Sequence, residues 1–205
     1  MGLLHELTEK PWLTEGCDTD SAITDTPLDS RASYFGLKVL LGVASALFML
    51  IIVAYAYRMT FGDWKAISEP WLLWINTLLL VLSSVGMQKA WNSAYSGQTE
   101  GLKTGMRIGC ICVLGFLVGQ YYVWYDLVES GYYASINVAA AFFYVLTALH
   151  ALHVFGGLVA LLRAILTLWR YGSIEKVRIS VELCAVYWHF LLFMWIILFA
   201  LLLLT

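Results

Sequence analysis

The stretch FFYVLTALHALHVFGG, residues 142–157, sets two histidines near the middle of an apolar segment that runs from Val138 to Leu162. A segment of that length can cross the ~30 Å hydrocarbon core of a bilayer, which takes about 20 helical residues. Helix positions three residues apart share one face, so His150 and His153 point the same way. Ionisable side chains at this depth normally face protein rather than lipid. The stretch therefore predicts a spanning helix whose polar face packs against another helix.

The last apolar segment of the chain has a polar face of its own. Glu182 and His189 lie seven residues apart, which is about two helical turns, so they fall on one side of a helix. We expect the two faces to meet. The prediction is a polar seam between neighbouring spanning helices, made of His150, His153, Glu182 and His189.

Composition assigns the chain to the membrane proteins. Hydrophobic residues make up 61% of its 205 residues, and the mean hydropathy is +0.78, more apolar surface than a soluble domain can hide. Only residues 1–33 have soluble character, and they are rich in acidic side chains. We expect residues 1–33 to be a retained, partly disordered acidic tail on a transmembrane domain of residues 34–205. No basic surface of the nucleic-acid-binding kind is present.

Five apolar segments are long enough to span a bilayer, so the expected fold class is all-α, a bundle of five transmembrane helices. The connections between them are polar; the expected second connection runs from Trp91 to Thr104 and the fourth from Arg163 to Arg178. The expected spans are Tyr34 to Tyr57, Trp71 to Ala90, Gly105 to Tyr125, Val138 to Leu162 and Ile179 to Leu204.

The distribution of lysine and arginine predicts the orientation. With five spans the termini lie on opposite sides, and basic residues favour the cytoplasmic side. Arg58 and Lys65 belong to the side of the C-terminus. The side of the N-terminus carries Arg31, Lys38, Lys89, Lys103, Arg107, Arg163, Arg170, Lys176 and Arg178. We expect a multi-pass protein of a bacterial inner membrane, with a cytoplasmic N-terminus and a periplasmic C-terminus.

Other polar and small residues inside the spans favour helix packing. Hydrogen bonds between membrane helices contribute about 0.6 kcal/mol each on average, and glycines let helix backbones approach closely. The residues to which we assign this role are Asn76, Ser83, Ser84, Gln120, Gly156 and Gly157.

The sequence offers little for binding a metal or haem within the chain. Cys110 and Cys112 point to different sides of a helix, and no cysteine spacing matches a metal site. Haem ligation by His150 and His189, or a proton relay, remains an alternative to a structural polar cluster, which we favour. We therefore expect no catalytic residue and no cofactor bound by this chain.

Two motifs resemble subunit III of the haem-copper oxidases, the cytochrome c oxidase subunit III family. The first is HALHVFGG at residues 150–157, preceded by Phe142, Phe143 and Thr147, and the second is ELCAVYWHF at residues 182–190, followed by Trp195. Further matches are Trp74, Asn76, Thr77, Ser83 and Ser84 in the second span, and Gln120 and Trp124 in the third. The resemblance covers about residues 34–205. It implies a five-helix form of a fold that has seven helices in mitochondria.

Three positions depart from the family pattern. Family members often carry carboxylates at the positions that Ala46, Val123 and Leu192 occupy here. The first of these carboxylates is associated with the lipid-binding cleft of the family. The resemblance therefore leaves any role of a mid-membrane carboxylate open, whereas the architecture does not depend on it.

The resemblance also implies a function. The family subunit is non-catalytic and packs beside subunits I and II, which hold the haems and copper of a proton-pumping oxidase that accepts electrons from cytochrome c. It binds phospholipids and supports the stability and proton uptake of subunit I. The alternatives are an accessory protein of a quinol oxidase or a nitric oxide reductase, and a stand-alone haem b protein that uses His150 or His153 with His189.

Overall fold

The computed structural model describes residues 27–61, 64, 71–172 and 174–204. Most of the predicted acidic tail lies outside these residues, although its last part, residues 27–33, is helical. The described residues form helices α2 (Pro27–Arg58), α3 (Leu72–Tyr95), α4 (Thr99–Glu129), α5 (Val138–Tyr171) and α6 (Ile174–Leu203). All five helices are long and apolar enough to cross a membrane. The prediction of an all-α fold with five transmembrane helices is confirmed.

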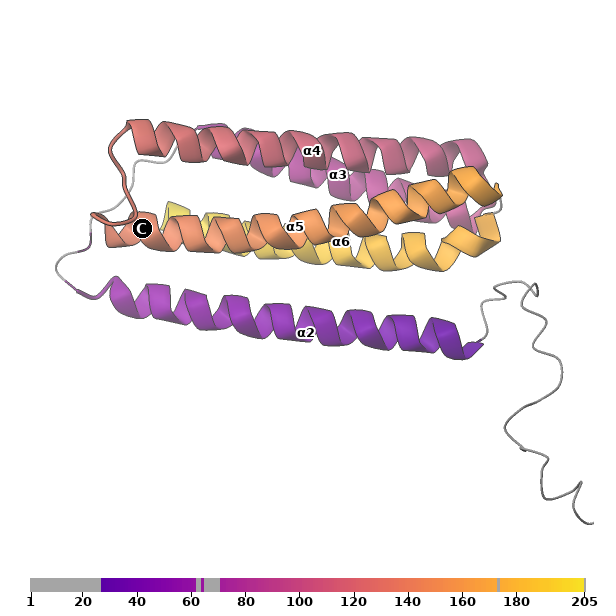
Figure 1. The fold of residues 1–205 in the computed structure, drawn as a ribbon, viewed down its shortest axis with the longest axis horizontal. Coiled ribbons are helices and arrows are strands. Elements are labelled where there is room, and N and C mark those ends of the chain that lie inside the picture. The colour runs from indigo at the N-terminus through magenta and orange to yellow at the C-terminus, as the bar shows by residue number, and fades with distance from the viewer. Residues whose placement is uncertain (1–26, 62–63, 65–70, 173, 205) are drawn as a thin grey trace, which may run out of the picture.

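The helices alternate in direction and lie side by side (Figure 1). Helices α3 to α6 form a four-helix bundle in which α3 packs on α4 and α6, and α5 packs on α4 and α6. Helix α2 lies along the outside of this bundle, against α5 and α6 (Figure 1). Only 17% of its most apolar stretch is buried, against 33 to 39% in the other helices. Helix α2 is therefore the most peripheral of the five.

Helices α3 and α4 approach each other most closely because glycines line their contact. A Cβ atom added at Gly105 would lie 2.6 Å from the Gly86 carbonyl oxygen and 2.6 Å from the Ala90 nitrogen. At Gly109 it would lie 3.0 Å from the sulfur of Met87. Gly105 and Gly109 form a GxxxG pattern, which presents a flat strip on which the partner backbone can rest. Side chains at these positions would force the helices apart.

The helices continue beyond the apolar segments, so two expected connections are wrong. Most of residues 91–104 and 163–178 is helical, because backbone hydrogen bonding continues through polar turns that hydropathy places outside the bilayer. The chain reverses sharply at Gly97, with φ +72°, and at Gly172, with φ +64°. Glycine adopts this left-handed conformation without a steric penalty. Asn137 caps α5, where its Oδ1 accepts hydrogen bonds from the backbone nitrogens of Ala139 and Ala140.

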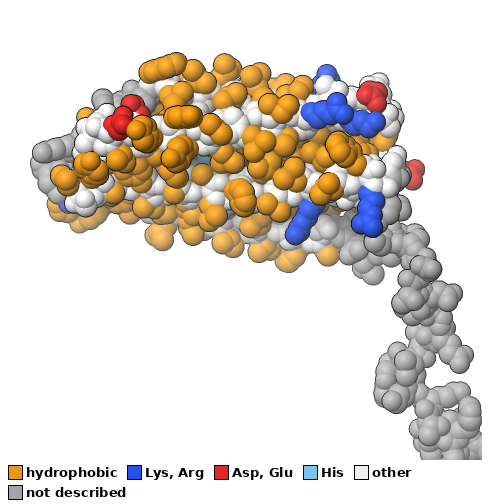
Figure 2. Space-filling view, turned by 45° about the horizontal axis from the view of Figure 1, so that its top comes forward, with side chains coloured by type: hydrophobic (Ala, Val, Ile, Leu, Met, Phe, Trp, Pro, Cys, Tyr) orange, Lys and Arg blue, Asp and Glu red, His pale blue; other side chains and the backbone are white. Residues whose placement is uncertain are grey.

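The surface matches a membrane environment. Apolar side chains cover the middle of the visible face, and Lys and Arg side chains gather at the end where α2 begins (Figure 2). The exposed apolar residues include Leu50, Val85, Ile111, Leu152 and Phe193. An apolar belt of this extent would aggregate in water, whereas in a bilayer it faces lipid chains.

Candidate functional site: the histidines and their partners

His150 lies at the centre of the bundle, enclosed by aromatic rings. Its side chain is 0% exposed. The rings of Phe48 of α2, Phe116 of α4 and Trp195 of α6 have centroids 6.4, 5.8 and 5.1 Å from the imidazole centroid. Both ring nitrogens lack a hydrogen-bond partner among the residues that the structure describes. Four helices thus meet around an imidazole that is held by packing.

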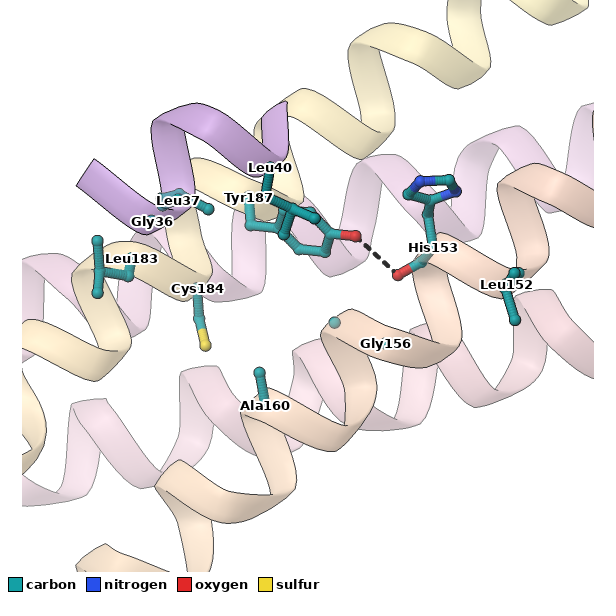
Figure 3. A pocket seen from close by; sticks show the side chains of 11 residues that line it. Gly36, Leu37, Leu40, Leu152, His153, Gly156, Ala160, Leu183, Cys184 and Tyr187 are labelled. Atoms are coloured by element: carbon teal, nitrogen blue, oxygen red, sulfur yellow. Dashed lines mark hydrogen bonds between the residues drawn. The ribbon is translucent and has the colours of Figure 1, made fainter. Parts of the chain in front are cut away.

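His153 lies one turn further along α5, toward α2. Its ring is 5.4 Å from that of Phe48, which therefore contacts both histidines of the motif. The imidazole Nδ1 is 2.7 Å from the Leu149 carbonyl oxygen and, because that oxygen can only accept, carries the proton. The Tyr187 hydroxyl of α6 donates to the backbone oxygen of His153 at 3.0 Å, which ties α6 to α5 (Figure 3).

A cavity of about 480 Å³ opens between α2, α5 and α6, next to His153. Figure 3 shows Gly36 and Leu40 of α2 on one side and Gly156 of α5 on another. The lining is almost entirely apolar, with Leu37, Leu152, Ala160, Leu183 and Cys184 among its residues. A pocket of this size and character suits a hydrocarbon chain better than a polar substrate.

Glu182 interacts with α2. Its carboxylate lies close enough to the Tyr34 hydroxyl of α2 to interact with it, and the charge of Arg178 acts on the same tyrosine. Arg178 also lies over the Tyr95 ring, with its guanidinium carbon 4.3 Å from the ring centroid. Glu182 therefore joins the start of α2 to α6, near the end of the bundle that carries the basic residues.

His189 faces α3. Its Nδ1 is 2.5 Å from Ser84 Oγ, and its Nε2 is 2.8 Å from Oε1 of Gln88. The amide nitrogen of Gln88 donates in turn to Oδ1 of Asn92 at 3.1 Å. These four side chains form a continuous chain of hydrogen bonds along α3.

The structure brings some members of the predicted polar seam together and separates others. His150 and His153 share the Phe48 contact, whereas Glu182 pairs with α2 and His189 with α3. Among the described residues, no hydrogen bond or ring contact joins either of the last two to the histidines of α5. The polar residues of α5 and α6 therefore serve three different helix contacts.

Indole N–H groups make hydrogen bonds that sequence reasoning missed. Trp188 donates to Ser83 Oγ at 2.7 Å, and Ser83 donates to the Gly109 carbonyl oxygen at 2.8 Å. Trp195 and Trp124 donate to the hydroxyls of Thr77 and Thr147 in the same manner. A tryptophan and a hydroxyl at similar depth on different helices are the only sequence signal for such pairs.

The helix-packing residues have different surroundings. Asn76 donates to Oε1 of Gln120 at 3.4 Å, both fully inside the bundle. A Cβ atom at Gly157 would lie 2.7 Å from the Tyr187 ring, so the helices approach closely there. The prediction of close packing is wrong at Gly156, where an added Cβ would meet nothing within 4 Å. Both glycines line the cavity, but adjacent helix positions face directions about 100° apart, and only Gly157 faces the Tyr187 ring closely.

Comparison with known proteins identifies the family. The sequence profile described as cytochrome c oxidase subunit III matches residues 63–204, which include α3 to α6 and both histidine motifs. The chain belongs to the cytochrome c oxidase subunit III family. A relative from Synechocystis, named cytochrome c oxidase subunit 3, is 31% identical over 97% of this chain and 89% of its own length. A protein of the same name from Corynebacterium diphtheriae is 30% identical over 76% of this chain and 77% of its own.

A more distant relative bears a different name. A Buchnera aphidicola protein named cytochrome bo(3) ubiquinol oxidase subunit 3 is 24% identical over 86% of this chain and 88% of its own length. The family resemblance expected from the two histidine motifs is thus confirmed, and with it a multi-pass membrane subunit III of the haem-copper oxidases. Among the described residues, no group of three or more His, Cys, Asp or Glu could hold a metal ion.

Proposed function

We propose that this chain is the non-catalytic subunit III of a proton-pumping terminal oxidase that passes electrons from cytochrome c to oxygen. The observation that carries the proposal is the family match over α3 to α6, together with relatives named cytochrome c oxidase subunit 3. In this role the chain packs beside subunits I and II, which hold the haems and copper. It stabilises subunit I and supports its proton uptake.

The surroundings of the histidines support the assignment of the redox centres to partner subunits. Haem ligation needs a free imidazole nitrogen that faces open space. The ring of His150 is enclosed by Phe116 and Trp195, and both nitrogens of His189 already have partners on α3. His153 has only its Nδ1 engaged, but a bis-histidine site would also need His189 as its second ligand. The stand-alone haem protein is therefore the weaker alternative.

The electron donor is proposed from relatedness. Two of the relatives described above are named cytochrome c oxidase subunits and are 30 to 31% identical, whereas the ubiquinol oxidase relative is 24% identical. Oxygen consumption of the purified complex with reduced cytochrome c, compared with a reduced quinol, tests this choice. If the complex consumed oxygen with the quinol and not with cytochrome c, the electron donor would be a quinol.

The orientation is proposed from charge. Lys103, Arg107, Arg163 and Arg170 belong to the end of the bundle where α2 begins, and basic residues concentrate at that end (Figure 2). We therefore place the N-terminus in the cytoplasm and the C-terminus in the periplasm of a bacterial inner membrane. Alkaline phosphatase fused after residue 205 is expected to be active, and an inactive fusion with an active cytoplasmic reporter would reverse the assignment.

Phospholipid is the proposed occupant of the apolar cavity beside His153, since an acyl chain matches its lining and volume. Lipid extracted from the purified complex is expected to fall in amount when Gly156 is replaced by a bulky residue that fills the cavity. Gly42→Leu serves as the control, because Gly42 does not line this cavity and nothing lies within 4 Å of its Cβ position.

The decisive experiment is purification of the tagged chain from its native membrane, followed by a reduced-minus-oxidised spectrum before and after partners are removed with harsher detergent. Haem absorbance that copurifies and then leaves with a larger subunit is the expected result. Haem that stays with the isolated chain would overturn the proposal and make His150, His153 and His189 ligand candidates.

A further inference from the structure

The outer surface between α3 and α6 carries a groove in which several polar side chains gather. The groove has a volume of about 510 Å³. Ser84, Gln88 and Asn92 of α3 line it, with Ser96 just after that helix and His189 and Leu192 of α6. Most of the lining surface is apolar, but the groove gathers more polar side chains than the rest of the exposed surface, which apolar residues mostly cover. The groove is separate from the buried centre around His150.

The hydrogen bonds in the groove have a defined direction. The Gln88 Oε1 atom can only accept, so His189 donates to it from Nε2, and Nδ1 of the same ring shares a hydrogen bond with the Ser84 hydroxyl. Gln88 then donates from Nε2 to Oδ1 of Asn92. The amide N–H groups of Asn92 stand at the end of the chain, without an acceptor among the residues that the structure describes. The groove therefore presents donors to its surroundings.

The end of the groove at Ser84 and His189 lies too deep in the bilayer for a lipid headgroup, whereas Asn92, about 30 Å along α3 from Leu72, lies near the boundary of the hydrocarbon core. Ser84 lies twelve residues after the start of α3 at Leu72, about 18 Å along the helix axis, and His189 lies near the middle of α6. Both residues therefore belong to the centre of a hydrocarbon core about 30 Å thick. An exposed imidazole at this depth is expensive in lipid and is normally covered by protein.

Other polar side chains at the surface of the helices do not have this requirement. Thr104 and Thr167 donate to carbonyl oxygens of their own helices, at Glu100 and Arg163. Such bonds satisfy a hydroxyl within the helix, so the side chain can face lipid. In contrast, the side chain of Gln88 donates to Asn92, and neither amide has a further hydrogen-bond acceptor within α3.

We propose that the groove between α3 and α6 docks a transmembrane helix of another oxidase subunit, and that this helix presents a hydrogen-bond acceptor, a carboxylate or a side-chain carbonyl, to Gln88 and Asn92. The inference rests on the proposed function and adds the face and the chemistry of the contact. Lys89, which also lines the groove, favours an acidic acceptor near the cytoplasmic end. A helix on this surface would shield His189 from lipid.

Photo-crosslinking in the assembled complex tests the proposal. A photoreactive amino acid replaces Val85, which lines the groove and is 60% exposed, and in a control replaces Val118 of α4, which is 56% exposed outside the groove. We expect at least about fivefold more adduct with a membrane subunit from position 85 than from position 118. Adducts with lipid alone at position 85, or equal subunit adducts at both, would overturn the proposal.

A double variant provides the second readout. Gln88→Leu with Asn92→Leu is expected to weaken retention of the chain on the complex in detergent about tenfold, the factor for two lost interhelical hydrogen bonds. Thr167→Val is the control and should be retained as the wild type is. Unchanged retention of the double variant refutes the docking groove, whereas a wild-type chain that copurifies with no haem-containing subunit refutes the proposed function instead.

Discussion

The α3/α4 contact allows a packing prediction with a matched control. In Gly105→Ala, the new methyl group would lie 2.6 Å from two backbone atoms of α3, whereas ordinary contact begins at 3.4 Å. The two helices must therefore separate by about 0.8 Å at that point. A gap of 0.5 to 1 Å loses roughly a quarter to a half of the dispersion attraction between the atoms that face it. Backbone atoms cannot rotate away, so the contact cannot relax as a side chain would.

Gly42→Ala is the control for helix propensity. An added Cβ at Gly42 of α2 would meet nothing within 4 Å, so this variant has only the gain of about 0.5 to 1 kcal/mol that alanine has over glycine in a helix. Overpacking costs about 1 to 3 kcal/mol. We therefore expect the free energy of unfolding of Gly105→Ala to lie about 1 to 3 kcal/mol below that of Gly42→Ala.

The free energies can be measured by SDS titration of the purified chain in mixed micelles, with helix content followed by circular dichroism. The two variants should shift the unfolding midpoint in opposite directions from the wild type. Equal midpoints for Gly105→Ala and Gly42→Ala would mean that α3 and α4 are not in backbone contact, and the reasoning about the glycine strip would fail.

Four further substitutions, at three positions, test the hydrogen bonds and the aromatic centre in the same assay. Ser83→Ala removes the acceptor of the Trp188 indole and should lower the free energy of unfolding by about 1 to 2 kcal/mol, since a buried donor is stranded. His150→Phe keeps a ring in the aromatic enclosure and removes two unpaired nitrogens, so stability should be retained, whereas His150→Ala should cost about 2 to 4 kcal/mol through the cavity it leaves. Tyr187→Phe loses one hydrogen bond to the His153 carbonyl and should cost about 0.6 kcal/mol.

Each of these tests has a contrary outcome. Thr167→Val is the shared control, because Thr167 is only half-buried and bonded only to its own helix, and it should change the midpoint little. A Ser83→Ala midpoint equal to that of Thr167→Val would show that Trp188 finds another acceptor. A His150→Phe variant as unstable as His150→Ala would show that the imidazole nitrogens have partners that stabilise the fold.

Hydrophobic periodicity and length predicted the fold class and the helix number because a bilayer allows few solutions. A spanning segment must satisfy its own backbone hydrogen bonds, so an apolar run of about 20 residues becomes a helix. The same reasoning made the helices too short. Helix α4 begins at Thr99 rather than Gly105, and α5 continues to Tyr171 rather than Leu162. Hydropathy reports the thickness of the bilayer core, while the helix ends where a glycine such as Gly172 reverses the chain.

By itself the sequence determined which polar residues share a helix face, at which depth they lie, and, through two histidine motifs, the family. It could not determine which neighbour each face meets, because periodicity fixes angles around one helix and not the arrangement of helices about each other. Only the tertiary structure assigned His150 to an aromatic enclosure, Glu182 to α2 and His189 to α3. The glycine contact of α3 and α4 and the peripheral place of α2 set that arrangement, and with it the groove in which His189 lies.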